Sequence, residues 1–266
     1  MTRVVLVTGA SSGLGAATAC HLAGLGYRVY AASRRGTVEP ANGASALMPL
    51  TMNVDDDASV GHAIDAVWAR EGRIDVVVNC AGFGVAGAIE DTPLAMAQAQ
   101  FNTNVFGVLR VCQRVLPLMR RARAGLIVNV TSIGGELALP FQGLYSASKF
   151  AVEGLSEALR VEVRPFGIDV VLVQPGDFRT GFTAARHLAA PGDSPYADRA
   201  RRALEIASRD ENAGADPQQV ARLIARIVAS RHPKLRYVAG PAAQEWLMRL
   251  RYVLPGRWLI ARHFGA

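Results

Sequence analysis

A tyrosine and a lysine, Tyr145 and Lys149, stand four residues apart at the beginning of a predicted helix, Ser146–Val163. Residues at positions i and i+4 share one helix face, so the phenol and the amine can meet around one ligand. A tyrosine that acts as a base at neutral pH needs its pKa lowered by about three units, or about 4 kcal/mol. An ammonium about 4 Å away supplies about that much at an effective dielectric of about 20, while burial opposes it. The pair therefore predicts a proton donor or acceptor at Tyr145.

A serine lies at the end of a strand predicted upstream of this pair. The segment Leu126–Thr131 is rich in branched residues, and Ser132 follows it directly. Its hydroxyl is expected to hydrogen-bond a substrate oxygen and to hold that oxygen near Tyr145. Each residue also has an ordinary explanation: a turn cap for Ser132, a helix-start aromatic for Tyr145 and a surface charge for Lys149. Their combination with a glycine-rich turn near the N-terminus favours catalysis.

That turn joins the first predicted strand, Val4–Thr8, to the first predicted helix, Gly15–Leu25. Backbone N–H groups at a helix N-terminus and the helix dipole bind anions, and glycine permits a close approach or a positive φ. The spacing Gly-x-x-x-Gly-x-Gly differs from the usual Gly-x-Gly-x-x-Gly fingerprint. A tight turn without a ligand is the alternative, but the place between a strand and a helix favours a dinucleotide pyrophosphate. The predicted contacts are Gly9, Ser11, Ser12, Gly13, Leu14 and Gly15.

The end of the second predicted strand, Arg28–Ala32, distinguishes between two nicotinamide cofactors. An NAD enzyme places a carboxylate about 20 residues after the glycines, whereas an NADP enzyme places an arginine there. Here Ser33, Arg34 and Arg35 follow the strand, with no carboxylate. A guanidinium binds a 2′-phosphate through two hydrogen bonds, so NADP is favoured over NAD and Arg34 is the expected contact. One of the two arginines is expected to be a solvated loop end.

These residues need a framework that brings strand ends and helix starts together. The sequence has 266 residues, 50% of them hydrophobic, and short apolar runs alternate with helix-like segments. Nearly continuous Val, Ile and Leu runs are typical of strands covered on both faces, and the alternation predicts a parallel sheet with right-handed crossovers. We therefore expect one Rossmann-type, doubly wound α/β domain over residues 1–266, with about seven strands and helices on both faces. The expected strands are Val4–Thr8, Arg28–Ala32, Ala46–Met52, Ile74–Asn79, Leu126–Thr131, Asp169–Gln174 and Leu235–Ala239, and the expected helices are Gly15–Leu25, Ala58–Glu71, Leu94–Arg121, Ser146–Val163 and Gln218–Ser230.

One long segment interrupts the alternation. Residues 177–215 are rich in Gly, Pro, Asp and Ala. A connection of this length without secondary structure is usually a lid or a binding loop, or is disordered, and we expect it to cover the substrate.

The extension over about 240–266 mixes aromatic residues with arginines. That mixture suits contact with a membrane surface, or packing over the cleft or against another subunit, and the packing is favoured.

Composition argues against several other classes of protein. No apolar run reaches the roughly 20 residues of a transmembrane helix, and the apolar start is too short for a signal peptide. The net charge of +7 comes from scattered arginines without a basic run interleaved with aromatics, so no nucleic-acid partner is expected. The three cysteines, Cys20, Cys80 and Cys112, have no CxxC spacing and fit buried positions in a reducing cytoplasm. No metal site is predicted.

Taken together, the motifs resemble those of the short-chain dehydrogenases/reductases, in their shorter, non-extended branch. The resemblance implies a seven-stranded doubly wound sheet and a hydride transfer between NADP(H) and a carbonyl or alcohol carbon of a small molecule, with Tyr145 exchanging the proton. It runs from about Val4 to Ala239 and includes the glycine-rich turn, Asn79-Cys80-Ala81-Gly82, Asn104, Ser132, Tyr145, Lys149 and Pro175-Gly176.

The resemblance also implies a role for each residue near the nicotinamide. Lys149 would lower the pKa of Tyr145 and hold the nicotinamide ribose. Asn104 would order a water that feeds protons to the lysine. The amide of the nicotinamide would be held by Pro175, Gly176 and Thr180.

The adenosine side shows two departures from the family pattern. Asn53 and Val54 stand where the family often has Asp-Val, and the asparagine carbonyl can still accept a hydrogen bond from the adenine amine. Cys80 replaces the second asparagine of the usual Asn-Asn-Ala-Gly. The residues implied to line this side of the cofactor are Asn79, Ala81 and Gly82.

The stretch Tyr145–Leu159 and the extended C-terminus are similar to the branch that contains 17β-hydroxysteroid and retinol dehydrogenases, which implies an apolar steroid-, retinoid- or lipid-like substrate. Family members commonly pair through the helices that here hold residues 104–121 and 145–163, so a homodimer or homotetramer is expected. Two other functions stay open: a regulatory protein that senses NADP(H) without catalysis, and a membrane-associated lipid binder on the same fold. An intact set of Asn104, Ser132, Tyr145 and Lys149 favours the enzyme.

Overall fold

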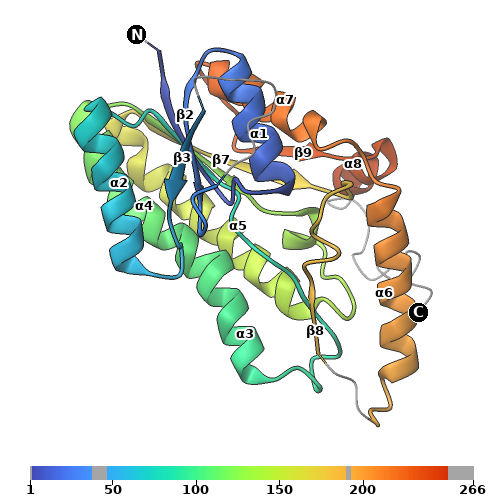
Figure 1. Cartoon of the computed structure of the whole chain (residues 1–266). Helices are drawn as coiled ribbons and strands as arrows, with labels where there is room; N and C mark the ends of the chain where they lie inside the picture. Colours follow the sequence, from blue (N-terminus) through green and yellow to red (C-terminus); the bar gives the residue numbers. More distant parts are fainter. Residues whose placement is uncertain (1, 38–46, 190–192, 251–266) are drawn as a thin grey trace.

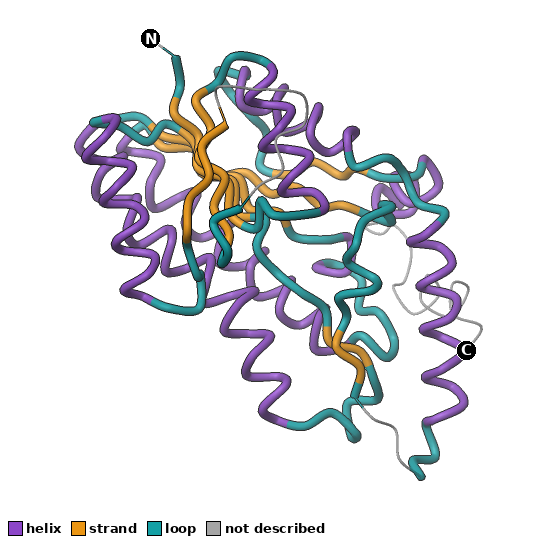
Figure 2. The backbone as a smooth tube through the Cα atoms, in the orientation of Figure 1, coloured by secondary structure: helices purple, strands orange, loops and turns teal. Residues whose placement is uncertain are grey.

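Seven strands form one parallel sheet in the order β3-β2-β1-β4-β6-β7-β9 (Figures 1 and 2). The computed structural model describes residues 2–37, 47–189 and 193–250. From β1 the chain winds outward through β2 and β3, and then returns to build β4, β6, β7 and β9 on the other side. This order is the doubly wound α/β fold, so the predicted fold is confirmed. The strands are β1 Val4–Thr8, β2 Arg28–Ser33, β3 Leu47–Thr51, β4 Val76–Asn79, β6 Gly125–Val130, β7 Ile168–Pro175 and β9 Arg236–Ala239.

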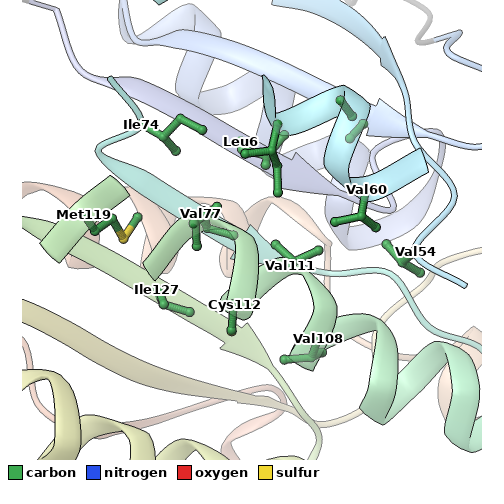
Figure 3. Close-up of a cluster of buried hydrophobic side chains, with 14 of the residues drawn as sticks. Leu6, Val54, Val60, Ile74, Val77, Val108, Val111, Cys112, Met119 and Ile127 are labelled. Carbon is green, nitrogen blue, oxygen red and sulfur yellow. The ribbon is translucent and has the colours of Figure 1, made fainter. Parts of the chain in front are cut away.

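The sheet separates two hydrophobic cores because side chains alternate along each strand. In β1, Val4 and Leu6 belong to one core, whereas Val5 and Val7 belong to the other. Figure 3 shows the first core, in which Leu6 lies among side chains of the sheet and of the covering helices. The helices that supply this core are α2 Asp57–Glu71, α4 Gly107–Ala122 and α5 Gly143–Val163, and those that supply the second are α1 Gly13–Gly24 and α7 Gln218–Ala229.

The helix predicted over Leu94–Arg121 is interrupted in the structure. It consists of α3 Leu94–Phe101, a π-helical segment Asn102–Phe106 and α4. A π turn holds one more residue than an α turn, so it rotates the side chains on either side of it relative to each other. Asn104 lies inside this segment and is buried. Residue patterns do not distinguish a single π turn from a continuous helix.

The prediction that residues 177–215 lack secondary structure is wrong. Helix α6 covers Ala197–Asn212, and the short strand β8, His187–Leu188, pairs with β5, Val85–Ala86. The helix forms because its segment is rich in Ala and Arg, which favour helices, and contains no Gly or Pro. Figure 1 shows α6 standing beside the sheet.

Helix α8, Ala242–Leu250, ends the described part of the chain. Met248 is buried, whereas Trp246 is 61% exposed. Most of the tail for which membrane contact and packing were weighed lies outside the described residues. Within the residues that are described, no helix combines the length and the apolar character needed to cross a bilayer.

Candidate active site

A cavity of about 760 Å³ lies where the carboxyl ends of several parallel strands meet. Open α/β sheets commonly bind ligands at this edge. Most of the predicted site residues line the cavity although they are far apart in the sequence. They are Gly9, Ser11, Ser12, Gly13, Leu14, Gly15, Arg34, Asn53, Val54, Ala81, Gly82, Ser132, Tyr145, Lys149, Pro175, Gly176 and Thr180.

The glycine-rich turn has no room for a side chain at Gly9 or Gly15. Gly9 has a φ of 66°, and a Cβ atom there would lie 2.7 Å from the Cα of Ala81. A Cβ on Gly15 would lie 2.3 Å from the backbone oxygen of Gly9. The hydroxyl of Thr8 accepts hydrogen bonds from the backbone N–H groups of Cys80 and Ala81, which ties the turn to the neighbouring strand end.

Helix α1 begins directly at this turn and presents its N-terminus to the cavity. Ser12 is its N-cap residue and makes no capping hydrogen bond through its side chain, and the first turn carries no acidic residue. Unpaired N–H groups and the positive end of the helix dipole attract anions. The arrangement therefore suits a phosphate group.

Arg34 follows β2 and lines the same cavity, at the end where β2 and β3 terminate. It is exposed and, within the described residues, makes no ion pair. The adjacent Arg35 is exposed as well but does not line the cavity. This difference agrees with the expectation that one of the two arginines is a solvated loop end. Asn53 and Val54 also line this end of the cavity.

Asn79 is placed differently from the prediction and does not line the cavity. It is 3% exposed, and its amide donates a hydrogen bond of 2.8 Å to Oδ1 of Asn129. Asn129 in turn donates to the hydroxyl of Ser156 on α5. As the last residue of β4, Asn79 shares the sheet face of Val77, so its side chain points between the sheet and the helices. The prediction did not consider that side chains alternate between the two faces of a strand, which directs the side chain of Asn79 away from the cavity.

Asn104 also lies outside the cavity wall. Its Oδ1 accepts a hydrogen bond from the backbone N–H of Phe83, and its amide donates to the oxygen of Phe83 and to the hydroxyl of Ser148. These bonds hold the loop after β4 against α5. The water that Asn104 was expected to order stays a prediction.

Ser132 and Tyr145 meet at the cavity wall. The backbone N–H of Gly134 donates to the hydroxyl of Ser132, which fixes this side chain at the end of β6. Burial raises the pKa of Tyr145 to about 12, and hydrogen bonding to Ser132 only partly opposes that rise. Two carboxylates, Glu211 and Asp177, raise the pKa of Tyr145 further, whereas Arg186 lowers it. At neutral pH Tyr145 is therefore a phenol that can donate a proton.

Lys149 lines the cavity beside this tyrosine but is bound to a different group. Its ammonium donates a hydrogen bond of 3.0 Å to the oxygen of Val130 and lies 5.8 Å from the centre of the Tyr145 ring. Burial lowers the pKa of Lys149 to about 8, so the amine remains mostly protonated at neutral pH. Burial of the phenol dominates the pKa of Tyr145. The lowering of that pKa by Lys149 stays a prediction.

Sequence reasoning missed the apolar and acidic walls of the cavity near Tyr145. The ring of Phe182 lies 5.5 Å from that of Tyr145, and Phe83 and Phe178 also line the cavity. Helix α6 adds one face, because residues one turn apart line the wall together. Its lining residues are Ile206, Ala207, Asp210 and Glu211. The sequence offered one signal for this wall, which was the position of the α6 segment after the last predicted site motif. The signal was not used, because the composition of the segment was interpreted as that of a loop.

The family comparison agrees with this geometry. The short chain dehydrogenase family matches residues 3–190, which is more than half of the sequence. The chain belongs to the short-chain dehydrogenase family. This relationship supports an oxidoreductase activity and confirms the resemblance on which the catalytic roles were based.

Two curated relatives of this dehydrogenase have assigned substrates in their names. It is 43% identical to a 3-ketodihydrosphingosine reductase of Bacteroides thetaiotaomicron, over 95% of this chain and 93% of the relative. It is 38% identical to retinol dehydrogenase 8 of Bos taurus, over 88% of this chain and 80% of the relative. The second relative agrees with the expected likeness to retinol dehydrogenases.

Solved structures of the family share the fold. A short-chain dehydrogenase from Streptomyces avermitilis is 34% identical with a TM-score of 0.84, covering 95% of this chain and 93% of its own. One from Burkholderia phymatum, solved in complex with NAD, is 28% identical with a TM-score of 0.78 and the same coverage. One from Burkholderia cenocepacia, solved in complex with NADP, is 25% identical with a TM-score of 0.76, covering 98% and 97%. These neighbours hold different cofactors, so they do not decide between NAD and NADP for this chain.

The burial of Tyr145 gives a prediction for the protein without ligand. Because the pKa of this phenol is raised to about 12, we expect it to stay protonated across the neutral range and to ionise only in strong alkali. The measurement is the ultraviolet absorbance of phenolate against pH, taken as the difference between the wild type and Tyr145→Phe. Ionisation of this residue near pH 7 would show that burial does not control it.

Proposed function

We propose that this protein is an NADP(H)-dependent oxidoreductase that transfers a hydride between the nicotinamide and a carbonyl or secondary alcohol carbon. The observation that carries the proposal is the placement of Ser132, Tyr145 and Lys149 in one cavity with a glycine-rich helix start. The family relationship supports the same reaction class. Small-molecule substrates follow from the size of the cavity, about 760 Å³.

The residues present fit a dinucleotide. The pyrophosphate would lie against the turn at Gly9 and Gly15, where Cβ atoms would collide with the backbone. Asn53 would accept a hydrogen bond from the adenine amine, and Lys149 would bind the nicotinamide ribose. Pro175, Gly176 and Thr180 would hold the nicotinamide amide, and Ala81 and Gly82 would line the adenosine side.

The reduced cofactor, when bound, supplies a hydride to the carbonyl carbon of the substrate. The residues of the chain handle the oxygen of that carbonyl. Ser132 holds the oxygen by a hydrogen bond, and Tyr145 donates its proton to the oxygen as negative charge develops there. Lys149 remains protonated beside Tyr145 and stabilises the phenolate that is left. Because burial raises the pKa of Tyr145 to about 12, the resting site holds the phenol form that carbonyl reduction requires.

The preference for NADP rests on Arg34. No carboxylate stands at this position to bind a ribose hydroxyl and repel a phosphate. The guanidinium of Arg34, which pairs with no carboxylate of residues 2–37, 47–189 and 193–250, can form two hydrogen bonds with a 2′-phosphate. NAD, which lacks that phosphate, would gain nothing from this arginine.

For the substrate we propose a long-chain amino ketone. The walls near Tyr145 are apolar at Phe83, Phe178 and Phe182, and carboxylates of α6 line the cavity beside them. Glu211 pairs with the buried Arg186, which offsets its charge, whereas Asp210 pairs with Arg209, whose side chain is 73% exposed. Of the two carboxylates, Asp210 therefore retains more of its attraction for an ammonium. A substrate with an apolar chain and an ammonium near its carbonyl complements such walls. The 3-ketodihydrosphingosine named for the bacterial relative is a compound of this type.

The two other functions that the sequence left open do not require the same residues. A protein that only senses NADP(H), or only binds lipid, has no need of the pair Ser132 and Tyr145.

Self-association to a homodimer or homotetramer belongs to this proposal too. It is supported by apolar side chains that α5 and the π-helical segment leave exposed, namely Phe106, Phe150 and Val161.

The role of Arg34 can be separated from that of its neighbour. We expect Arg34→Ala to weaken the binding of NADPH by about 10- to 100-fold, because hydrogen bonds between charged groups are lost, and to leave NADH almost unchanged. Arg35→Ala is the matched control and should change neither affinity. The measurement is the dissociation constant of each reduced cofactor by fluorescence titration. An unchanged NADPH to NADH ratio in Arg34→Ala would place the recognition of the phosphate elsewhere.

Removal of one hydroxyl tests the proton transfer. Tyr145→Phe should lose turnover of ketones by roughly 10²- to 10⁴-fold or more, since the donor of the proton is gone. NADPH should still bind, which shows that the cavity is intact. Steady-state kinetics with NADPH oxidation as the signal measures the first effect and fluorescence titration the second. Turnover at the wild-type rate in Tyr145→Phe would contradict the catalytic assignment and favour the other functions.

The amine of the substrate can be tested without altering the protein. A long-chain 2-amino-3-ketone should have a kcat/KM at least roughly tenfold higher than the same ketone without the amino group, because the carboxylates attract the ammonium. Asp210→Asn should reduce the ratio of the two kcat/KM values, because it removes a negative charge from the cavity wall. Asp198→Asn, a change on the same helix at a residue that does not line the cavity, should not. Equal kcat/KM values for the two ketones in the wild type would rule out recognition of the amine.

A further inference from the structure

A buried carboxylate stands one helical turn beyond Lys149. Glu153 on α5 is only 5% exposed. Its Oε1 accepts hydrogen bonds of 2.6 Å from the hydroxyl of Thr131 and 3.0 Å from the amide of Gln174, and its Oε2 accepts one of 2.9 Å from Nε of Arg236. A buried charge persists only where such partners satisfy it. Glu153 therefore joins α5 to β7, to β9 and to the residue that follows β6.

Two partners of Glu153 directly precede residues of the candidate site. Thr131 follows the last residue of β6 and comes immediately before Ser132. Gln174 lies on β7 immediately before Pro175. The carboxylate thus fixes the backbone from which the substrate contact and the nicotinamide contact both project.

The same side chain packs close to Lys149. A Cβ atom on Gly135 would lie 3.2 Å from Cβ of Lys149 and 3.3 Å from Cγ of Glu153. The loop after the catalytic serine therefore rests on the helix between the lysine and the glutamate. The two side chains share one helix face, since they are four residues apart.

Glu153 shares its guanidinium partner with two other carboxylates. Glu136, Glu153 and Glu157 all pair with Arg236. Of these three, Glu153 is the one that is buried and stands one helical turn from Lys149, so its charge is the one expected to act on the ammonium.

The other titratable groups that face Lys149 carry no charge at neutral pH. Burial raises the pKa of the Cys80 thiol to about 12, and that of the Tyr145 phenol to about 12 as well. Asn104 and the oxygen of Val130, the remaining polar neighbours, are neutral. Glu153 is therefore the anion that stabilises the ammonium, against the burial that lowers the pKa of Lys149 to about 8.

We propose that Glu153 is a positioning residue that keeps Lys149 in its ammonium form and holds the Ser132 and Pro175 segments against α5. Its importance for hydride transfer rests on the proposed function. Its effect on Lys149 does not, because that effect is present without cofactor or substrate. The two can therefore fail separately.

The chain offers an unusually direct measurement, because it contains only two lysines, Lys149 and Lys234. Full-length, ligand-free protein with ¹³C at the lysine ε-carbons gives one NMR signal for each. The pH dependence of each signal gives the pKa of that amine. Lys234 is exposed and serves as the internal reference.

In the wild type we expect the Lys149 signal to titrate near pH 8. In Glu153→Gln, which keeps the shape but removes the charge, the pKa of Lys149 should fall by about one unit, while Lys234 stays unchanged. The pH at which turnover declines on the alkaline side should move down by the same amount. Glu157→Gln, on the same helix and the same arginine but half exposed, is the matched control and should shift neither.

An unchanged pKa of Lys149 in folded Glu153→Gln overturns the proposal. If Glu153→Gln does not fold, Arg236→Gln decides, because loss of the guanidinium leaves the carboxylates uncompensated and should raise the pKa of Lys149. A pKa that is equal to or below the wild-type value in Arg236→Gln overturns the proposal too. A lysine that titrates as expected in protein without turnover would uphold this inference and contradict the proposed function instead.

Discussion

The burial of one ammonium is the constraint on which the site depends. An amine that is removed from water loses its charge unless nearby groups favour the protonated form. For Lys149 these groups are the oxygen of Val130 at the end of β6 and the carboxylate of Glu153 one turn along α5. Both groups belong to the framework. The charge of the lysine is therefore a property of how α5 packs against the sheet, and it exists before any ligand binds.

The parallel sheet explains why loops from several strands line one cavity. All strands of the main sheet run in the same direction, so their carboxyl ends meet at one edge. The turn after β1, the loop after β4 and the segment after β6 line the same cavity there. Thr8 and Asn104 both hold the loop after β4, through side-chain hydrogen bonds to its backbone groups. The site is assembled by connections between loops whose strands are already fixed in register by the two cores.

The sequence predicted this fold and most of the cavity because both depend on local signals. Apolar runs and the glycine-rich turn have a length and a spacing that can be recognised without tertiary contacts. Asn79 was misplaced because its direction depends on strand register, which puts it on the face of Val77. The walls from α6 were missed because they depend on how the chain returns after β7. The protonation state of Tyr145 could not be derived from the spacing to Lys149, because it depends on how deeply tertiary packing buries the phenol.

The opposite shifts of the two pKa values describe a resting site that holds a neutral phenol beside an ammonium. Burial disfavours the charged form of each group, so it raises the pKa of Tyr145 and lowers that of Lys149. At neutral pH the phenol is nonetheless protonated and the amine still largely charged. A carbonyl oxygen that gains negative charge needs a proton and a nearby cation, and this combination provides both. Oxidation of an alcohol needs the phenolate, which the cationic ring of an oxidised nicotinamide would have to stabilise against the same burial. The charge that a cofactor brings would thus decide which protonation state of Tyr145 is favoured, in a site that by itself keeps its tyrosine neutral.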